Sequence, residues 1–230
     1  MTSQNNSLIP QLLAADQTEL LSHCEEIAIE IGSVLLNRHT GERFAYFLRS
    51  SSVAMVVRDT CGRGLALGLI GPEGAVGLQL GLGMGSGVMT YQVQSSGLAW
   101  RIQARVLKQL VQNRPTLLLA FAKYLCVVSQ EVATMATAAQ SQDIRARLAY
   151  WIVLSQERSG PSPLLLTQNY LADMLGVRRA SVTLAAMELK ARGLLEYRRG
   201  KVFVLDPKGL EKMARATPAS DVAIPQRPSR

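Results

Sequence analysis

The residues with the clearest chemistry are basic side chains concentrated between positions 167 and 205. Arg178 and Arg179 stand at the expected start of a helix, and Arg198, Arg199 and Lys201 surround a predicted turn. A guanidinium group matches the paired acceptors of guanine in the major groove, and basic side chains at a turn suit phosphate oxygens. The alternative for the turn is an ordinary solvated loop, and for Arg179 it is a phosphate contact. The pattern favours a surface for double-stranded DNA.

The spacing around these residues predicts a helix-turn-helix. Thr167 can cap the first helix, Ala172 is small where two helices would cross, and Gly176 accepts the positive φ of a tight turn. The second helix is expected from about Arg178 to Arg192. Apolar positions at helical spacing complete the motif: Leu171, Leu175, Val177, Val182, Ala185, Ala186 and Leu189.

A β-hairpin is predicted directly after the second helix. Gly193 ends the helix, residues 194–197 and 201–205 form two strands, and residues 198–200 form the turn between them. A helix-turn-helix followed by such a hairpin is typical of a winged DNA-binding domain.

This segment resembles the C-terminal domain of the Crp/Fnr superfamily of bacterial transcription regulators. In that superfamily the recognition helix opens with an Arg, commonly followed by Glu, and carries a second Arg one turn later. Arg179 matches the first Arg, whereas Ala180 and Leu184 stand in place of the other two. The resemblance implies a sequence-specific transcription regulator that also contacts RNA polymerase. Because two base-reading side chains differ, the superfamily's best-known operator is not carried over.

Two sets of side chains are expected to contact DNA. Arg179 is the first candidate for reading a base, and its neighbours near the start of the helix are candidates for adjacent bases or the backbone. The base-reading set is Arg179, Arg178, Ser181 and Thr183. The phosphate set is Thr167, Gln168, Lys190, Arg198, Arg199 and Lys201.

A long apolar helix is predicted ahead of the DNA module, beginning at Pro115. One seam follows a strict 3-4-3-4 spacing: Leu118, Phe121, Leu125, Val128, Val132, Met135 and Ala139. Such a helix can pair with a second copy or pack on its own domain, and Leu117, Leu119 and Ala122 suggest a second face for the latter role. In the superfamily the corresponding helix forms the dimer interface, so the resemblance favours a homodimer. A twofold dimer would bind an inverted repeat with half-sites about 34 Å apart.

Residues 8–102 are predicted to be mainly antiparallel β structure. Large apolar residues alternate with small or polar ones at 27–31 and 89–93, and glycines recur from Gly64 to Gly87, as in a small β-barrel. The superfamily places a cyclic-nucleotide-binding-like roll here. We therefore expect an α+β fold with an N-terminal antiparallel β-roll of jelly-roll type, a long dimerisation helix and a C-terminal winged helix-turn-helix. The expected boundaries are 1–112 for the sensor domain, 113–140 for the dimerisation helix, 141–215 for the DNA-binding domain and 216–230 for a disordered tail.

The distribution of charge supports a polyanionic partner. Residues 1–140 carry 10 Lys and Arg against 9 Asp and Glu, whereas residues 141–230 carry 15 against 8, so nearly all of the net charge of +8 is C-terminal. Anionic membrane is the rival polyanion. No uninterrupted apolar run of about 18 residues occurs and the N-terminus lacks the features of a signal peptide, so we expect a cytoplasmic protein without membrane contact.

The roll is not expected to bind a cyclic nucleotide, and the effector is left open. Members of the superfamily that bind cyclic AMP use Gly-Glu-Leu followed by an Arg that meets the phosphate. Here the comparable region reads Gly77-Leu78-Gln79-Leu80, without the Glu, and Met89 stands where the Arg would fall. An unpaired phosphate in an apolar roll would cost several kcal/mol.

No cofactor, metal or enzymatic activity is expected. Cys24, Cys61 and Cys126 are not clustered as the iron-sulfur ligands of the Fnr branch are, and His23 and His39 lack metal-ligand spacing. The sequence has no nucleophile elbow, zinc motif or Walker loop. The alternative function is a small-molecule or redox sensor, or an interaction module, with only generic affinity for DNA.

Overall fold

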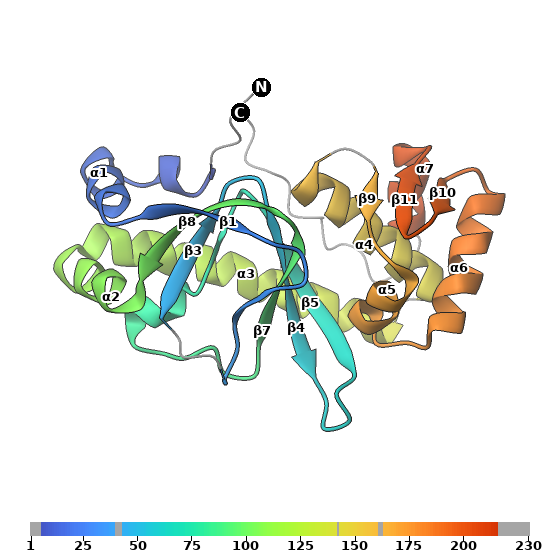
Figure 1. The fold of residues 1–230 in the computed structure, drawn as a ribbon, viewed down its shortest axis with the longest axis horizontal. Helices are drawn as coiled ribbons and strands as arrows, with labels where there is room; N and C mark the ends of the chain where they lie inside the picture. The colour runs from blue at the N-terminus through green and yellow to red at the C-terminus, as the bar shows by residue number, and fades with distance from the viewer. Residues whose placement is uncertain (1–5, 40–42, 142, 161–162, 216–230) are drawn as a thin grey trace. The chain divides into compact units, whose positions relative to one another are not determined.

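A computed structural model of the chain describes residues 6–39, 43–141, 143–160 and 163–215 (Figure 1). The chain divides into two compact units. The first contains Met1–Val57 and Gly68–Gln130, and the second contains Arg58–Leu67 and Glu131–Arg230. The predicted tail, residues 216–230, lies outside the described residues.

The N-terminal strands form two four-stranded sheets. The first sheet has the order β1 (Glu25–Ile29), β8 (Gly97–Gln103), β3 (Phe44–Leu48) and β6 (Ala75–Val76). The second has the order β2 (Val34–Leu36), β7 (Thr90–Ser95), β4 (Ser52–Arg58) and β5 (Gly64–Ile70). Ile27 pairs with Ala99 and Met55 with Tyr91 in antiparallel registers. The expected antiparallel β-roll is confirmed.

Short helices precede, interrupt and follow the strands of the roll, and the sequence analysis did not predict them. They are η1 (Ile9–Gln11), α1 (Ala14–Ser22), η2 (Leu78–Leu82) and α2 (Ala104–Asn113). Leu20 of α1 and Leu107 of α2 are fully buried in one core with Phe47 of β3 and Phe121 of the following helix. These helices are stabilised mainly by burial against the roll, because isolated helices of nine or ten residues are marginal in water.

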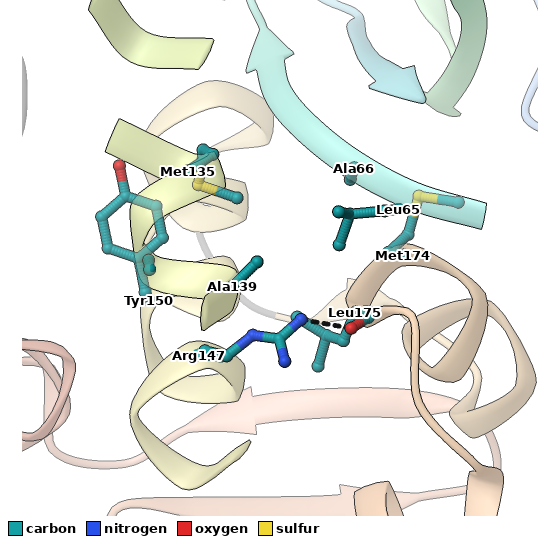
Figure 2. A pocket seen from close by; sticks show the side chains of 9 residues that line it. Leu65, Ala66, Met135, Ala139, Arg147, Tyr150, Met174 and Leu175 are labelled. Atoms are coloured by element: carbon teal, nitrogen blue, oxygen red, sulfur yellow. Dashed lines mark hydrogen bonds between the residues drawn. The ribbon is translucent and has the colours of Figure 1, made fainter. Parts of the chain in front are cut away.

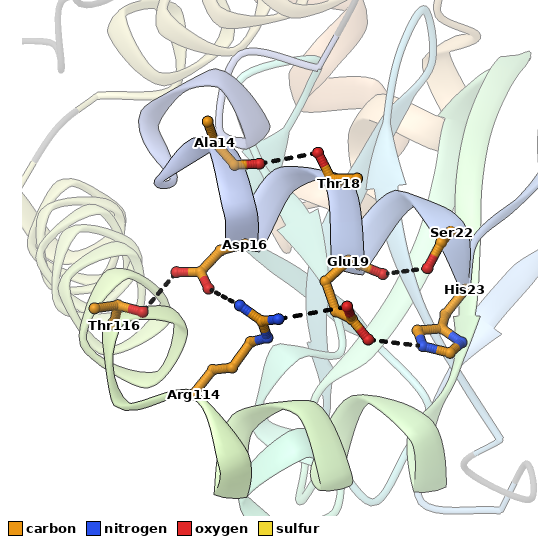
Figure 3. Close-up of polar contacts among 8 residues, drawn as sticks. All are labelled: Ala14, Asp16, Thr18, Glu19, Ser22, His23, Arg114 and Thr116. Carbon is orange, nitrogen blue, oxygen red and sulfur yellow. Dashed lines mark hydrogen bonds and ion pairs between the residues drawn. The ribbon is translucent and has the colours of Figure 1, made fainter.

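The long helix α3 (Pro115–Ser141) begins where the sequence predicted. Pro115 disfavours helical geometry at Arg114, whose φ of −133° separates α2 from α3. Figure 3 shows how this break is held against α1: buried Asp16 accepts hydrogen bonds from Arg114 Nη1 at 3.0 Å and Thr116 Oγ1 at 2.6 Å. Glu19 accepts a second bond from Arg114 at 3.4 Å. The start of α3 is therefore fixed to the first unit.

The second unit contains the predicted winged helix-turn-helix. The helices of this domain are α4 (Ile144–Ser159), α5 (Gln168–Leu175), α6 (Arg179–Ala191) and α7 (Pro207–Ala214). Its sheet is formed by β9 (Leu164–Leu165), β10 (Leu195–Arg198) and β11 (Lys201–Val204). The sheet order is β10, β11, β9. The sequence analysis did not predict β9 or α7. A strand of two residues is too short to show alternation. The cap Asp206, followed by Pro207, was the local signal that could have identified α7.

Candidate nucleic-acid interface

The turn between α5 and α6 has the geometry that the sequence predicted. Thr167 caps α5 by accepting a hydrogen bond from the backbone N–H of Tyr170 at 3.1 Å. Gly176 ends α5 with φ of 65°, and a β-carbon there would lie 3.3 Å from the carbonyl oxygen of Gly64. Gly176 is therefore required both for its left-handed backbone and for the close approach of a neighbouring chain segment.

One side of α6 is buried and the opposite side is exposed. Val182, Ala185, Ala186 and Leu189 are buried, and α6 packs on α4, α5 and β10. Arg178 and Arg179 are exposed at the N-terminal end of the helix. This is the end that enters the major groove in helix-turn-helix proteins.

The four predicted base-reading residues have different environments. Arg178 and Arg179 are exposed, whereas Ser181 is half-buried. The Thr183 hydroxyl donates to Oε1 of Gln168 at 2.9 Å and also lies 3.1 Å from the carbonyl oxygen of Arg179. The structure therefore joins Thr183, predicted to face bases, to Gln168, predicted to face phosphate. In the free chain Thr183 positions the Gln168 amide.

The wing turns in two residues. Arg199 and Gly200 both have positive φ, 48° and 78°, which places an arginine in a left-handed turn position usually taken by Asn or Gly. Arg198, Arg199 and Lys201 are all exposed around this tip. The Tyr197 hydroxyl donates a hydrogen bond to the carbonyl oxygen of Leu166 and so anchors the wing. Burial raises the pKa of Tyr197 to about 12, and the positive charge of Arg179 acts in the opposite direction.

Glu196 lies among the predicted phosphate contacts, and the sequence analysis did not single it out. Its carboxylate accepts from Lys190 Nζ at 3.2 Å and from Arg198 Nη2 at 2.8 Å. Arg198, and then Lys190, hold the pKa of Glu196 below its usual range. Two predicted phosphate contacts are thus paired with an acid in the free chain. The sequence signal for this pairing was the position of Glu196 between the basic residues Lys190 and Arg198. Only the fold brings the Lys190 side chain close to Glu196.

Arg58 is distant from the helix-turn-helix in the sequence, but the fold places it beside α5. Its guanidinium donates to both carboxylate oxygens of Asp173 on α5, at 3.0 and 2.8 Å, and this hydrogen bonding raises the pKa of Arg58. The backbone N–H of Gly64 donates to the same carboxylate at 3.0 Å. Asp173 therefore ties the segment Arg58–Leu67 to α5 within the second unit.

The predicted dimer seam on α3 requires a correction. Phe121 and Met135 were expected to face a partner, but they are only 2% and 8% exposed and pack against their own chain. Leu119 was expected to pack on its own domain, but it is 56% exposed. Leu117 is buried as expected. The heptad spacing identified an apolar helix correctly but could not show which neighbour covers each face.

The rest of the seam is exposed or half-buried. Leu118 is 38% exposed, and Leu125, Val128, Val132 and Ala139 are half-buried. An outward stripe lies beside it with a 3-4-3-4-3 spacing: Leu119, Ala122, Cys126, Ser129, Ala133 and Ala136. All of its members are exposed except Ala122, which is half-buried.

By length and composition alone, Pro115–Gln140 could also cross a membrane, with a mean hydropathy of 1.4; it is the one such helix in the described part of the chain. A helix with a long apolar face meets this test whether its partner is lipid or protein. The expectation of no membrane contact therefore stays a prediction.

A small pocket in the second unit lies beside Tyr150 and Arg147 (Figure 2). Arg147 donates to the carbonyl oxygen of Leu175 at the end of α5, and burial lowers the pKa of this arginine. Burial raises the pKa of Tyr150 to about 12, with Glu131 adding to the effect. The pocket has room for about one water molecule, so it does not suit an effector of nucleotide size.

The described residues contain no group of three or more His, Cys, Asp or Glu that could hold a metal ion. Cys24 is half-buried, and Cys61 and Cys126 are exposed free thiols. Burial raises the pKa of the Cys24 thiol to about 12, which makes it unreactive.

Comparison with known proteins agrees with this architecture. The family of Crp-like helix-turn-helix domains matches residues 146–213. No curated protein sequence matches the chain. Among solved structures, a protein described as a transcriptional regulator of the Crp/Fnr family from Eubacterium rectale has a TM-score of 0.73 at 18% identity, covering 91% of this chain and 98% of that one.

Two further solved structures share the fold. The c-di-GMP-responsive global regulator CLP of Xanthomonas campestris has a TM-score of 0.68 at 21% identity, covering 84% of this chain and 99% of its own. A Crp/Fnr-family regulator of Thermus thermophilus has a TM-score of 0.64 at 24% identity, covering 83% and 98%. The chain therefore has the fold of the Crp/Fnr transcription regulators, and its residues 146–213 match the family of Crp-like helix-turn-helix domains.

Proposed function

We propose that this protein is a sequence-specific, DNA-binding transcription regulator that acts as a homodimer on an inverted-repeat operator. The observation that carries the proposal is the pair of exposed arginines, Arg178 and Arg179, at the N-terminal end of α6 in a Crp-like helix-turn-helix. The exposed basic wing beside it supplies phosphate contacts. We assign no catalytic activity, and we place the protein in the cytoplasm, where its DNA target lies.

Within this proposal Arg179 reads a base and Lys201 contacts phosphate. Selection of bound duplexes from a random pool by the full-length protein should enrich an inverted repeat with half-site centres about one helical turn apart. Arg179→Ala should relax sequence preference, with a loss of roughly 1 to 3 kcal/mol on the selected duplex. Lys201→Ala should weaken selected and random duplexes alike and flatten the salt dependence. Equal losses on both duplexes for both variants would contradict this division of roles, and a pool without enrichment would contradict the function.

We propose that the dimer forms through the outward stripe of α3, with contributions from Leu118. The small side chains of the stripe allow two helices to approach closely, and its 3-4 spacing matches that of a two-stranded coiled coil. In a parallel twofold pair, equivalent positions on the stripe lie opposite each other, so Cys126 would face its symmetry mate.

Thiol cross-linking tests this arrangement. A short bis-maleimide should join two full-length chains through Cys126, and Cys126→Ser should abolish the product. Cys61→Ser should leave it intact, because Cys61 is exposed in the turn between β4 and β5, away from α3 in the sequence. Cross-linking that depends on Cys61 instead, or a monomer at micromolar concentration in sedimentation, would contradict the proposed interface.

Lipid is the competing partner for α3. The proposal predicts that the protein purifies without detergent as a dimer and does not float with phosphatidylcholine vesicles. Flotation that survives high salt and is abolished by Leu119→Glu would instead assign the apolar face to a bilayer.

We propose that any effector is not a cyclic nucleotide. The segment from Gly77 to Tyr91 contains no arginine that could bind a phosphate. Met89, which stands at the position of the phosphate-binding arginine in the superfamily pattern, is half-buried. Calorimetry with cyclic AMP and cyclic GMP should give no heat of binding; micromolar affinity for either would overturn this statement.

A further inference from the structure

The exposed side of α6 is apolar where a DNA-reading helix commonly carries polar side chains. Leu184 and Met187 are each 63% exposed, and Ala180 is exposed one turn before Leu184. Positions 180, 184 and 187 lie on one face, opposite the buried Val182, Ala185, Ala186 and Leu189. We call these three residues the apolar stripe of α6. Large apolar side chains left this open on a soluble domain often mark a contact surface.

The surroundings of the stripe identify its occupant as DNA. Arg178 and Arg179 are exposed immediately before Ala180, and the Gln168 amide is held by Thr183 one turn away. Glu188, the acid within α6 itself, is paired with Arg145 at 2.8 Å. The apolar stripe of α6 is thus bordered by arginines, which could contact the phosphates on either side of the DNA major groove while the stripe faces the bases.

The major groove offers one apolar group on its natural base edges, which is the C5-methyl of thymine. We infer that Leu184, assisted by Ala180 and Met187, selects thymines in each half-site by contact with their methyl groups. The inference rests on the proposed function and specifies what the recognition helix reads beyond the base contacted by Arg179.

The length of the stripe sets the spacing of the contacts. Ala180 and Leu184 are four residues apart, a rise of about 6 Å along the helix, which is close to two base-pair steps. The contacted thymines should therefore lie within about two base pairs of each other, next to the guanine read by Arg179. Ala180 is short enough to let the helix approach the base edges closely.

Replacement of thymine by uracil tests the inference, because it removes only the methyl group. Each thymidine of the selected duplex is replaced singly by deoxyuridine, and binding is measured with the full-length protein. At one or two positions in each half-site, loss of the methyl should weaken binding about fourfold. Leu184→Ala should bind the thymine duplex about fourfold more weakly and should no longer distinguish thymine from uracil there.

A matched control is Leu205→Ala. Leu205 is 59% exposed in the same unit but follows β11, so this variant should keep the full sensitivity to uracil. Uracil sensitivity that persists in Leu184→Ala would overturn the assignment to Leu184. An enriched motif that tolerates uracil everywhere would overturn the inference and leave the proposed function standing. A pool without enrichment would overturn both.

Discussion

At the scale of single residues, the proposed DNA-binding surface contains an acid, Glu196, that competes with DNA phosphates for two of its basic side chains. Glu196 occupies Lys190 and Arg198, so a phosphate that uses either cation must displace the carboxylate. Such exposed pairs are weak, so the displacement is feasible, but it reduces affinity for every sequence equally.

We expect Glu196→Gln to bind random and selected duplexes several-fold more tightly and to steepen the dependence of affinity on salt. Fluorescence anisotropy across a salt series measures both effects. Glu30→Gln makes the same charge change on an exposed residue of the first unit and should leave the affinity nearly unchanged. An equal gain in both variants would attribute the effect to net charge alone.

The wing tip carries local strain at Arg199. A left-handed conformation costs a residue with a β-carbon about 1 kcal/mol or more, and Asn tolerates it better. Arg199→Asn should therefore raise the free energy of unfolding by about 0.5 to 1 kcal/mol while weakening DNA binding. Arg198→Asn, at the end of β10, should weaken binding without the gain in stability. Denaturant unfolding that shows no difference between the two variants would exclude strain as a factor.

At the scale of elements, the helix-turn-helix depends on Gly176 more than on other glycines with the same backbone. Gly176 and Gly193 have φ of 65° and 72°, so alanine strains both turns by about 1 to 2 kcal/mol. Only at Gly176 would the new β-carbon press on a neighbouring backbone, the carbonyl of Gly64 at 3.3 Å. At Gly193 the structure leaves open space.

We therefore expect Gly176→Ala to destabilise the protein more than Gly193→Ala. Chemical denaturation, monitored by far-ultraviolet circular dichroism, measures the free energy of unfolding of both variants. The backbone strain is similar in the two because the φ angles are similar. Equal losses of stability would show that the Gly64 segment yields without cost.

At the scale of the whole molecule, dimerisation and DNA binding should be coupled. Nearly all of the net charge of +8 lies in residues 141–230, so two copies present two cationic heads to one duplex. Each DNA-binding domain alone can contact one half-site. In the dimer, binding of the first domain makes binding of the second domain intramolecular, which raises the affinity for the whole operator.

Ala133→Glu places two carboxylates opposite each other in the proposed interface, and we expect the dimer dissociation constant to rise about tenfold or more. Binding to the inverted repeat should fall accordingly, while binding to a single half-site should not change. Ala15→Glu, an exposed position on α1, is the matched control and should leave sedimentation and binding as in the parent chain. A dimer that persists with Ala133→Glu would place the interface elsewhere.

The sequence alone determined the winged helix-turn-helix and the antiparallel roll. Their signals are local: Thr167 caps its helix within three residues, Gly176 adopts the predicted positive φ, and alternation marks the strands. Capping, turn geometry and periodicity act over a few residues, so one chain segment carries all the information they require.

Only the tertiary structure decided which face of α3 is covered, that Thr183 holds Gln168, and that Glu196 pairs with Lys190. It also decided that Leu184 stays exposed while Val182, two residues earlier, is buried. The physical reason is that burial and ion pairing depend on which distant segments meet. Helical spacing places apolar residues on a face but contains no information about what that face contacts.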